Sequence, residues 1–199
     1  SVLASVERQG LSERTIVVFL SDNGHSTEDR AHGGGGSAGP LRGAKHTLWE
    51  GGIRVPCIAS WPGQVPAGEV RDQPAMAMDW MPTLSELCGV PLPQDRAIDG
   101  RSLASVLESP SAPPPHERLH WVHYDGSFAV REGNWKLHYR LQHETWLADL
   151  NADPGERVNR TAQERDRSQT MMSAHNRHLM EIAAKATHLL RQQQRKSVE

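Results

Sequence analysis

The sequence contains a short polar segment, Asp22, Asn23 and Gly24, whose side chains and backbone could bind a metal ion. The carboxylate of Asp22 and the amide oxygen of Asn23 are hard donors of the kind that Ca²⁺ or Mg²⁺ prefers. Gly24 would let the backbone turn sharply enough for both side chains to face one ion. Asp-Asn-Gly is also ordinary turn chemistry, so these three residues alone do not distinguish a metal site from a plain turn.

The position of these residues in the chain favours a site. They follow an apolar, β-branched run from Thr15 to Leu20, which predicts a fully buried strand. In open α/β sheets, ligands bind just beyond the carboxyl ends of the strands, which is where Asp22 and Asn23 would lie. A second short apolar run, from Cys57 to Trp61, predicts a neighbouring strand.

A second group of glycines and charged residues follows a loop that contains four consecutive glycines. Residues 39–56 read GPLRGAKHTLWEGGIRVP, with Arg42 and Lys45 before the tryptophan and Glu50 after it. A lysine ammonium is a compact donor to an anionic oxygen. This density of glycine and charge is unusual for a plain connection, so the segment is a second candidate for the site.

Together, these segments resemble the sulfatase family of the alkaline-phosphatase-like superfamily. The family pattern has a hydrophobic strand ending in S-D-N-G, a variable glycine-rich loop, G-x-x-R-G-x-K, an aromatic residue and E-G-G-x-R-x-P, followed by a strand and W-P-G. The sequence contains every part in this order, ending with Trp61, Pro62 and Gly63. Several linked motifs in the right order are far more specific than any one of them.

The resemblance implies roles for individual residues. Asp22 and Asn23 match two of the family's metal ligands, for which Ca²⁺ is expected rather than Mg²⁺. Lys45 matches the lysine that contacts the sulfate ester. His25 directly follows S-D-N-G and is a candidate for contact with the substrate or leaving group, with a solvated histidine as the alternative. Glu50 is expected to brace the loop as scaffold.

Other parts of the family's catalytic site do not occur in the sequence. The nucleophile motif, C-x-P-S-R or S-x-P-S-R, is absent, so neither Cys57 nor Cys88 is the residue that becomes formylglycine. The family's early pair of metal-binding aspartates is also absent. The resemblance is therefore to the C-terminal portion of a sulfatase, with formylglycine expected in an N-terminal half. Without that half, we expect no catalysis by these residues alone.

The activity implied by the resemblance is metal-dependent hydrolysis of a sulfate ester on a small molecule or carbohydrate. Family members are periplasmic, secreted or lysosomal, and this sequence does not choose among these compartments. Two other classes stay open. A phosphoesterase or phosphonate hydrolase of the same superfamily would share the core, and a truncated, non-catalytic protein would expose an apolar face on its first half.

Composition excludes some partners. The 199 residues are 23% charged with a net charge of −2, whereas nucleic-acid binders usually show a clustered basic excess. No apolar run approaches the roughly 18 to 20 residues of a membrane span. Oligomeric state is not indicated. Two cysteines do not make a disulfide framework; their pairing cannot be inferred from spacing, and buried thiols are expected.

The predicted fold class is α/β. Residues 1–108 are expected to form the C-terminal part of an alkaline-phosphatase-like sulfatase domain, and the proline-rich residues 109–115 a link. Residues 116–199 are expected to form a small α+β subdomain with a long C-terminal helix. Its antiparallel sheet is predicted from four short runs separated by turn signals: Leu119–Tyr124, Phe128–Arg131, Trp135–Tyr139 and Thr145–Leu150.

Apolar periodicity predicts two further features. Met78–Cys88 is expected to be a helix whose apolar stripe lies in the core. Residues 163–192 are expected to form a helix whose apolar stripe lies on the sheet. The stripe comprises Met171, Met172, His175, Leu179, Ile182, Ala186, Leu189 and Leu190. The histidines of the sheet region are interpreted as neutral surface or hydrogen-bonded groups: His116, His120, His123, His138 and His143.

Overall fold

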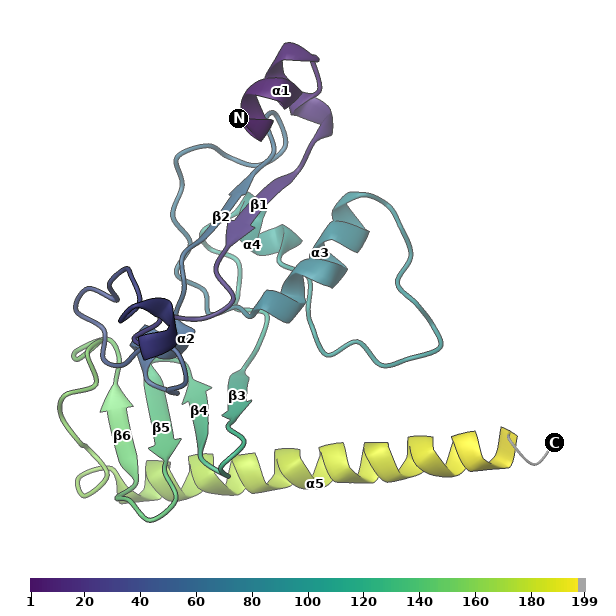
Figure 1. Cartoon of the computed structure of the whole chain (residues 1–199). Coiled ribbons are helices and arrows are strands. Elements are labelled where there is room, and N and C mark those ends of the chain that lie inside the picture. Colours follow the sequence, from purple (N-terminus) through teal and green to yellow (C-terminus); the bar gives the residue numbers. More distant parts are fainter. Residues whose placement is uncertain (197–199) are drawn as a thin grey trace. The chain divides into compact units, whose positions relative to one another are not determined.

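The computed structural model describes residues 1–196, with side chains described for all of these except residues 31 and 187–196. The chain divides into two compact units, each with its own sheet (Figure 1). The first unit comprises Ser1–Gly36 and Gly52–Glu117, and the second comprises Ser37–Gly51 and the chain from Arg118 onward. Each unit is therefore built from two separate stretches of sequence.

The first unit contains a two-stranded antiparallel sheet and short helices. Strand β1 pairs with β2, with Phe19 directly opposite Ile58. The helices of this unit are α1, α3 and α4, with 3-10 turns η1, η2 and η3. The bounds are α1 Val2–Arg8, η1 Ser12–Arg14, β1 Val17–Leu20, η2 Asp29–Ala31, β2 Cys57–Ser60, η3 Ala77–Asp79, α3 Trp80–Leu87 and α4 Ala104–Glu108. Helix α2, Glu50–Ile53, crosses the sequence boundary between the units.

The two predicted strands form, but β1 is not fully buried as the sequence suggested. Phe19 is 66% exposed and its cross-strand neighbour Ile58 is 62% exposed. Directly opposed residues of an antiparallel pair point to the same face. Among the residues that the structure describes, β1 pairs with β2 alone. The first unit therefore has an apolar sheet face that it does not cover itself.

Helix α3 forms where predicted, but its apolar stripe is not its buried face. Pro82 and Thr83 are buried, whereas Met81 is 50% exposed. The reason is a polar anchor at the start of the helix. Thr83 Oγ1 donates to the carbonyl of the buried Asp79 at 2.6 Å and accepts from the N–H of Leu103 at 2.8 Å. These bonds turn the threonine side of the helix inward.

The Asp79 carboxylate extends this anchor. It accepts hydrogen bonds from the N–H groups of Met76 at 2.7 Å and Arg101 at 2.8 Å. His116 Nε2 lies 2.7 Å from the same carboxylate. His116 is thus hydrogen-bonded, which confirms its interpretation. The network joins η3, the turn before α4 and the end of the proline-rich stretch within the first unit.

Both cysteines are free and exposed in the structure, so the prediction of buried thiols is wrong. Cys57 is the first residue of β2, in the sheet with the uncovered face. Cys88 directly follows α3, beyond the buried part of that helix. Their apolar character alone did not indicate that both cysteines lie at the ends of elements, in exposed positions.

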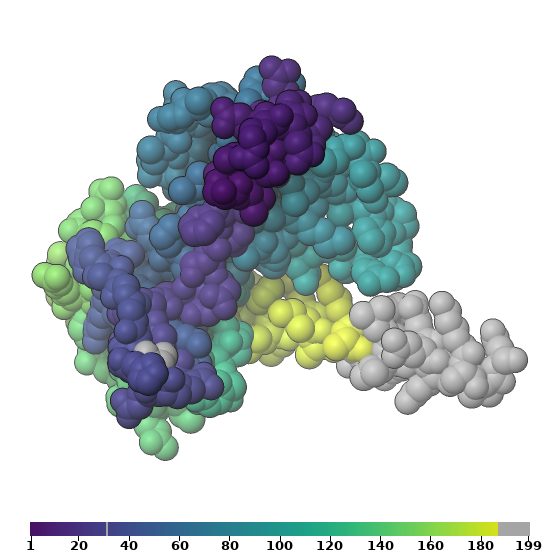
Figure 2. Space-filling model, turned by 45° about the horizontal axis from the view of Figure 1, so that its top comes forward, coloured from purple at the N-terminus to yellow at the C-terminus, as the bar shows by residue number. Residues whose placement is uncertain are grey.

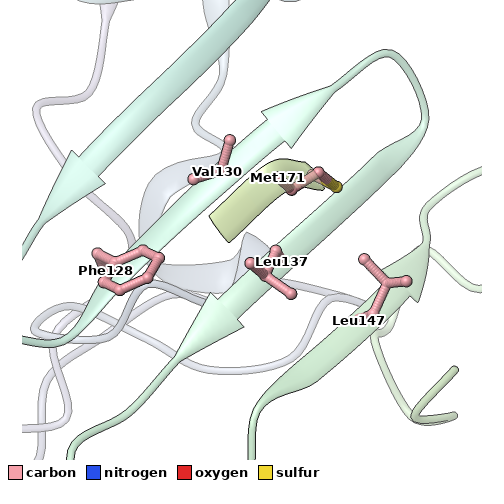
Figure 3. Close-up of a cluster of buried hydrophobic side chains, with 5 residues drawn as sticks. All are labelled: Phe128, Val130, Leu137, Leu147 and Met171. Carbon is pink, nitrogen blue, oxygen red and sulfur yellow. The ribbon is translucent and has the colours of Figure 1, made fainter. Parts of the chain in front are cut away.

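The second unit has the four-stranded antiparallel sheet that the sequence predicted, and its strand order is β3-β4-β5-β6 (Figure 1). The long helix α5 packs against the two central strands, β4 and β5. The core between them, shown in Figure 3, consists of Phe128, Val130, Leu137, Leu147 and Met171. The bounds are β3 Arg118–Val122, β4 Phe128–Glu132, β5 Trp135–Tyr139, β6 Trp146–Asp149 and α5 Arg165–Lys196.

Helix α5 lies on the sheet only through its N-terminal part. Met171 and His175 are each 1% exposed, whereas Leu179 is 40% and Ile182 48% exposed, and part of the later helix is visible in yellow at the surface in Figure 2. Leu189 and Leu190 lie outside the described side chains. At about 1.5 Å per residue, 32 residues extend well beyond strands of four or five residues. The predicted stripe is therefore longer than the face that receives it. In the part of the chain that the structure describes, no helix has the length and apolar character to cross a membrane.

Candidate functional site

The S-D-N-G turn directly follows β1 and belongs to the first unit. Ser21 Oγ donates to the carbonyl of Asn23 at 2.8 Å, and the N–H of Gly24 donates to the carbonyl of Gly52 at 2.9 Å. These bonds hold the backbone of the turn. The side chain of Asp22 is exposed and that of Asn23 is half-buried. The turn thus offers two adjacent oxygen donors at the end of a strand.

These donors fit a hard cation in type but supply only part of its coordination. Ca²⁺ takes about 6 to 8 oxygen ligands. Within the described residues, no group of three or more His, Cys, Asp or Glu side chains could hold a metal ion. Asp22 and Asn23 would therefore be two ligands of a larger set, and their assignment as metal ligands stays a prediction.

His25 lies one residue beyond the turn and is half-buried. Its Nδ1 atom is buried and has no hydrogen-bond partner among the described residues. The loop that follows folds back on itself: a Cβ on Gly34, whose φ is 76°, would overlap the carbonyl oxygen of Ser26. Only glycine permits that approach. The role of His25 toward a substrate stays a prediction.

Lys45 belongs to the second unit and lies on a tight turn from Ala44 to Thr47. The N–H and Oγ1 of Thr47 donate to the carbonyl of Ala44 at 3.1 and 2.7 Å. In return, the N–H of Ala44 donates to Thr47 Oγ1 at 3.2 Å. His46 takes a φ of 68°. Three hydrogen bonds thus define the backbone on both sides of the half-buried Lys45.

Arg42 is held between two tryptophans. Its Cζ lies 3.7 Å from the ring centroid of Trp49 and 4.9 Å from that of Trp146. Its Nη1 donates to the carbonyl of Glu156 at 3.1 Å. A guanidinium over an indole face is attracted by the negative face of the ring. The arginine of R-G-x-K and the aromatic residue that follows therefore fix each other, on either side of Lys45.

Two glycines allow this segment to fold tightly. Gly43 has φ of 86°, and a Cβ there would lie 2.5 Å from Thr47 Oγ1 and 2.8 Å from Trp49 Cβ. A Cβ on Gly51 would lie 2.6 Å from the carbonyl oxygen of Arg42, to which the N–H of Gly51 donates at 2.7 Å. The glycines of the motif are therefore required by close backbone approach.

Three buried charged side chains, one of them from this segment, contact one another. Lys136 Nζ is 2.9 Å from Glu50 Oε1 and 3.1 Å from Glu156 Oε1, and none of the three residues is more than 2% exposed. The second oxygen of Glu156 accepts from the N–H of Glu50 at 2.6 Å. Burial raises the pKa of Glu156, while the charge of Lys136 and the bond from the Glu50 N–H act in the opposite direction. Glu50 is thus the scaffold residue that the sequence indicated.

Sequence reasoning missed the partners of Glu50. Lys136 stands within the apolar strand sequence WKLHY, and Glu156 ends the turn sequence DPGE. The available signal was a single lysine in a strand that begins and ends with an aromatic residue. A lysine buried in such a strand needs a carboxylate partner, so the sequence indicated that a partner exists. The sequence alone does not say which carboxylate, since Glu50 lies 86 residues away.

The comparisons with known proteins agree with these motifs. The family model described as Sulfatase matches residues 1–90. Steryl-sulfatase from Mus musculus is 42% identical over 147 residues, which are 69% of this chain and 23% of that protein. The chain belongs to the sulfatase family. Arylsulfatase D from Homo sapiens is 44% identical over 149 residues, 69% of this chain and 25% of that protein. This sulfatase chain spans about a quarter of the length of these curated relatives, in their C-terminal part.

A solved structure extends the similarity over both units of this sulfatase chain. It is a protein in complex with its substrate, D-glucosamine-2-N,6-O-disulfate. The TM-score is 0.70 at 26% identity, covering 87% of this chain and 35% of that one. The expected sulfatase fold is therefore confirmed. Of the four predicted site residues, Asp22 and Asn23 lie on one turn of the first unit with His25 directly after it, and Lys45 lies in the second unit.

Proposed function

We propose that the protein to which this chain belongs hydrolyses a sulfate ester, R-O-SO₃⁻, with water to an alcohol and sulfate, in a metal-dependent reaction. The single observation that supports this most is the set of linked motifs, S-D-N-G and R-G-x-K through E-G-G-x-R-x-P, in a chain of the sulfatase family. The chain would supply two metal ligands and one cation to the site. The nucleophile is not among the residues of this chain that carry the family motifs.

Each of these residues has a specific task in the proposal. Asp22 and Asn23 would hold two coordination positions of a Ca²⁺ ion, which supplies charge neutralisation to sulfate oxygens when bound. The ammonium of Lys45 would donate to an ester oxygen and stabilise the negative charge that develops on the leaving alcohol. His25, with its buried Nδ1 lacking a partner among the described residues, is the candidate for orienting the leaving group.

The substrate class that we propose is a sulfated carbohydrate or a sulfated small molecule. The relative solved with D-glucosamine-2-N,6-O-disulfate, at 26% identity, supports the carbohydrate. The names of the steryl-sulfatase and arylsulfatase relatives support a sterol or an aryl alcohol. Both substrates carry the same anionic group, so the proposed roles of Asp22, Asn23 and Lys45 do not depend on this choice.

The test begins with the reading frame upstream of Ser1 and expression of the complete protein with a formylglycine-generating enzyme. Activity on p-nitrophenyl sulfate, p-nitrophenyl phosphate and a phenylphosphonate ester is then compared. We expect the sulfate ester to be preferred and a chelator to abolish the activity. Asp22→Asn should lower kcat/KM at least about 100-fold, because even groups that only support a metal ligand contribute about 10 to 100-fold.

Asp95→Asn is the matched control, since Asp95 is an exposed carboxylate that pairs with Arg96 outside the motifs. It should leave kcat/KM unchanged. Preference for the phosphate or phosphonate ester would replace the proposal by a phosphoesterase or phosphonate hydrolase. Absence of all three activities in a folded, metal-loaded protein would favour a non-catalytic protein, the class for which an exposed apolar face such as that of Phe19 and Ile58 was expected.

A further inference from the structure

The four-stranded sheet of the second unit has two differently covered faces. Leu137 points to the face that packs on α5, so its strand neighbours Lys136 and His138 point to the opposite face. On that face Lys136 forms an ion pair with Glu50, and the ring centroids of His138 and Trp49 lie 4.3 Å apart. Both Glu50 and Trp49 come from residues 37–51, which we name the Lys45 segment. The Lys45 segment therefore covers the second face of the sheet.

The contacts that hold the Lys45 segment on this face are specific rather than merely apolar. On one side of Lys45, Arg42 is held by Trp146 and by the carbonyl of Glu156. On the other side, Glu50 is paired with Lys136 and gives its N–H to Glu156. The two anchors are eight residues apart in sequence, and the turn that carries Lys45 lies between them.

Lys136 is the central charge of this arrangement. It is fully buried, and its Nζ contacts both carboxylates, one from the Lys45 segment and one from the turn after β6. Removing its charge would leave two buried carboxylates side by side, which repel each other and favour opening to water. Glu50, at the start of α2, and Glu156, in the turn after β6, both lie outside the sheet and can move toward water at less cost than a strand. Movement of either would release the Lys45 segment, because Glu50 belongs to it and Arg42 donates to the carbonyl of Glu156.

We propose that Lys136 is a positioning residue for Lys45: through the buried triad with Glu50 and Glu156, the C-terminal sheet sets the conformation of the segment that presents the sulfate-binding lysine. The role of Lys45 in this statement rests on the proposed function, whereas the conformational part rests on the contacts alone. The C-terminal sheet then sets how Lys45 is presented, in addition to forming the apolar core with α5.

The conformational part is tested by amide hydrogen exchange on the whole chain with Lys136→Met. The amides of Ala44, Thr47 and Gly51 are hydrogen-bonded in the native segment. We expect these three amides to exchange at least about tenfold faster through a local opening that does not depend on added urea, whereas the β4 amides exchange through global unfolding. Lys185→Met, at an exposed position of α5, is the matched control and should change neither. Equal protection in Lys136→Met and the native chain, or exchange of these three amides in the variant only through global unfolding, would overturn the proposal.

If Lys136→Met does not fold, the same hydrogen-exchange measurement is made on the triple variant Glu50→Gln, Lys136→Met, Glu156→Gln. It removes the three charges of the triad together, so neither carboxylate is left buried without Lys136, and Arg131 keeps its bond to the carbonyl of Gly133. We expect it to fold with the exchange of the Lys45 segment still faster than in the native chain, because the bond from Lys136 to Glu50 is lost. Native protection of the segment in this folded variant would show that packing alone positions it and would overturn the proposal.

The functional part is tested by a double-mutant cycle in the complete enzyme. If Lys136 acts through Lys45, then Lys136→Met should lower kcat/KM for p-nitrophenyl sulfate in the native background and have little further effect in a Lys45→Ala background. A purely structural role would give the same factor in both backgrounds and would contradict the proposal. Lys136→Arg, which keeps the charge, should restore part of the loss. An enzyme without sulfatase activity would refute the proposed function, while the exchange result would still decide whether Lys136 positions the segment.

Discussion

The two faces of the C-terminal sheet are built by opposite means. The face toward α5 is apolar and consists of Phe128, Val130 and Leu137 with their neighbours around Met171. The face toward the Lys45 segment carries a buried lysine and a buried histidine, Lys136 and His138. An apolar face accepts many packings of similar volume, whereas a buried charge accepts only the position of its partner. The second face is therefore suited to holding one particular loop conformation.

The adjacent residues Lys136 and Leu137 allow this comparison to be made within one strand. They differ by one position in sequence and lie on opposite faces of β5. Both are completely buried. A substitution at either position removes side-chain contacts from the same strand. If the two substitutions change stability or hydrogen exchange differently, the cause is therefore the face of the sheet and not the strand.

The largest effect is expected from Lys136→Met, which removes the cation that Glu50 and Glu156 share, while Arg131 Nη1 stays 3.9 Å from Glu50. Removal of one partner of a buried ion pair costs about 3 to 5 kcal/mol, so the free energy of unfolding should fall by about that amount. Urea unfolding followed by circular dichroism measures it. The triple variant that also neutralises both glutamates should recover most of the loss. A single variant as stable as the native chain would show that the charges are not desolvated together.

Leu137→Ala should be slightly less costly. The loss of a buried leucine side chain with incomplete collapse of the cavity costs about 2 to 5 kcal/mol. Because Leu137 contacts the α5 face, the extra hydrogen exchange should appear in β4 and α5 before it appears in the Lys45 segment. If Leu137→Ala and Lys136→Met accelerated the exchange of the same amides, the two faces of the sheet would unfold as one cooperative unit and would not differ in what they stabilise.

The apolar face was largely predictable from the sequence and the polar face was not. Alternation within β4 and β5 indicated the strands, and Met171 and His175 indicated the helix face that packs on them. Local pattern is enough for this because each apolar residue needs only some apolar neighbour. The pairing of Lys136 with Glu50 spans 86 residues and depends on where a loop folds back, which no local pattern encodes.

The candidate site shows the same limit. The S-D-N-G and R-G-x-K motifs could be located from the order of the residues, and the two strands near Asp22 form as predicted. The burial of those strands was overestimated, because a run of apolar residues does not report how many neighbours a sheet has. The clamp of Arg42 between Trp49 and Trp146 was also missed, since one tryptophan comes from the distant strand β6.

Lowering the pH should weaken both faces through their histidines. Burial lowers the pKa of His138 to about 3 and, with the charge of His178, that of His120 to about 4, both below the ordinary value of 6.5. The unfolded chain then binds more protons than the folded chain between these values and 6.5. Stability is therefore fully present above about pH 6.5 and is lost as the pH falls toward 4.

Urea unfolding at about pH 7.5 and about pH 5 measures this dependence. His138→Gln should reduce it on the face of the Lys45 segment, because Gln does not titrate. His143→Gln, at an exposed position, should leave it unchanged and serves as the control. An unchanged pH dependence in His138→Gln would show that this histidine is not held neutral by its surroundings.

The smallest effect is expected where α5 extends past the sheet. Leu179 belongs to the same apolar stripe as Met171 but is 40% exposed, compared with 1% for Met171. Leu179→Ala should change the free energy of unfolding by no more than about 0.5 kcal/mol, whereas Met171→Ala should cost about 2 to 5 kcal/mol. Equal costs of the two substitutions in urea unfolding would contradict this expectation. They would mean that Leu179 is buried in solution by a contact other than the one between α5 and this chain's own sheet.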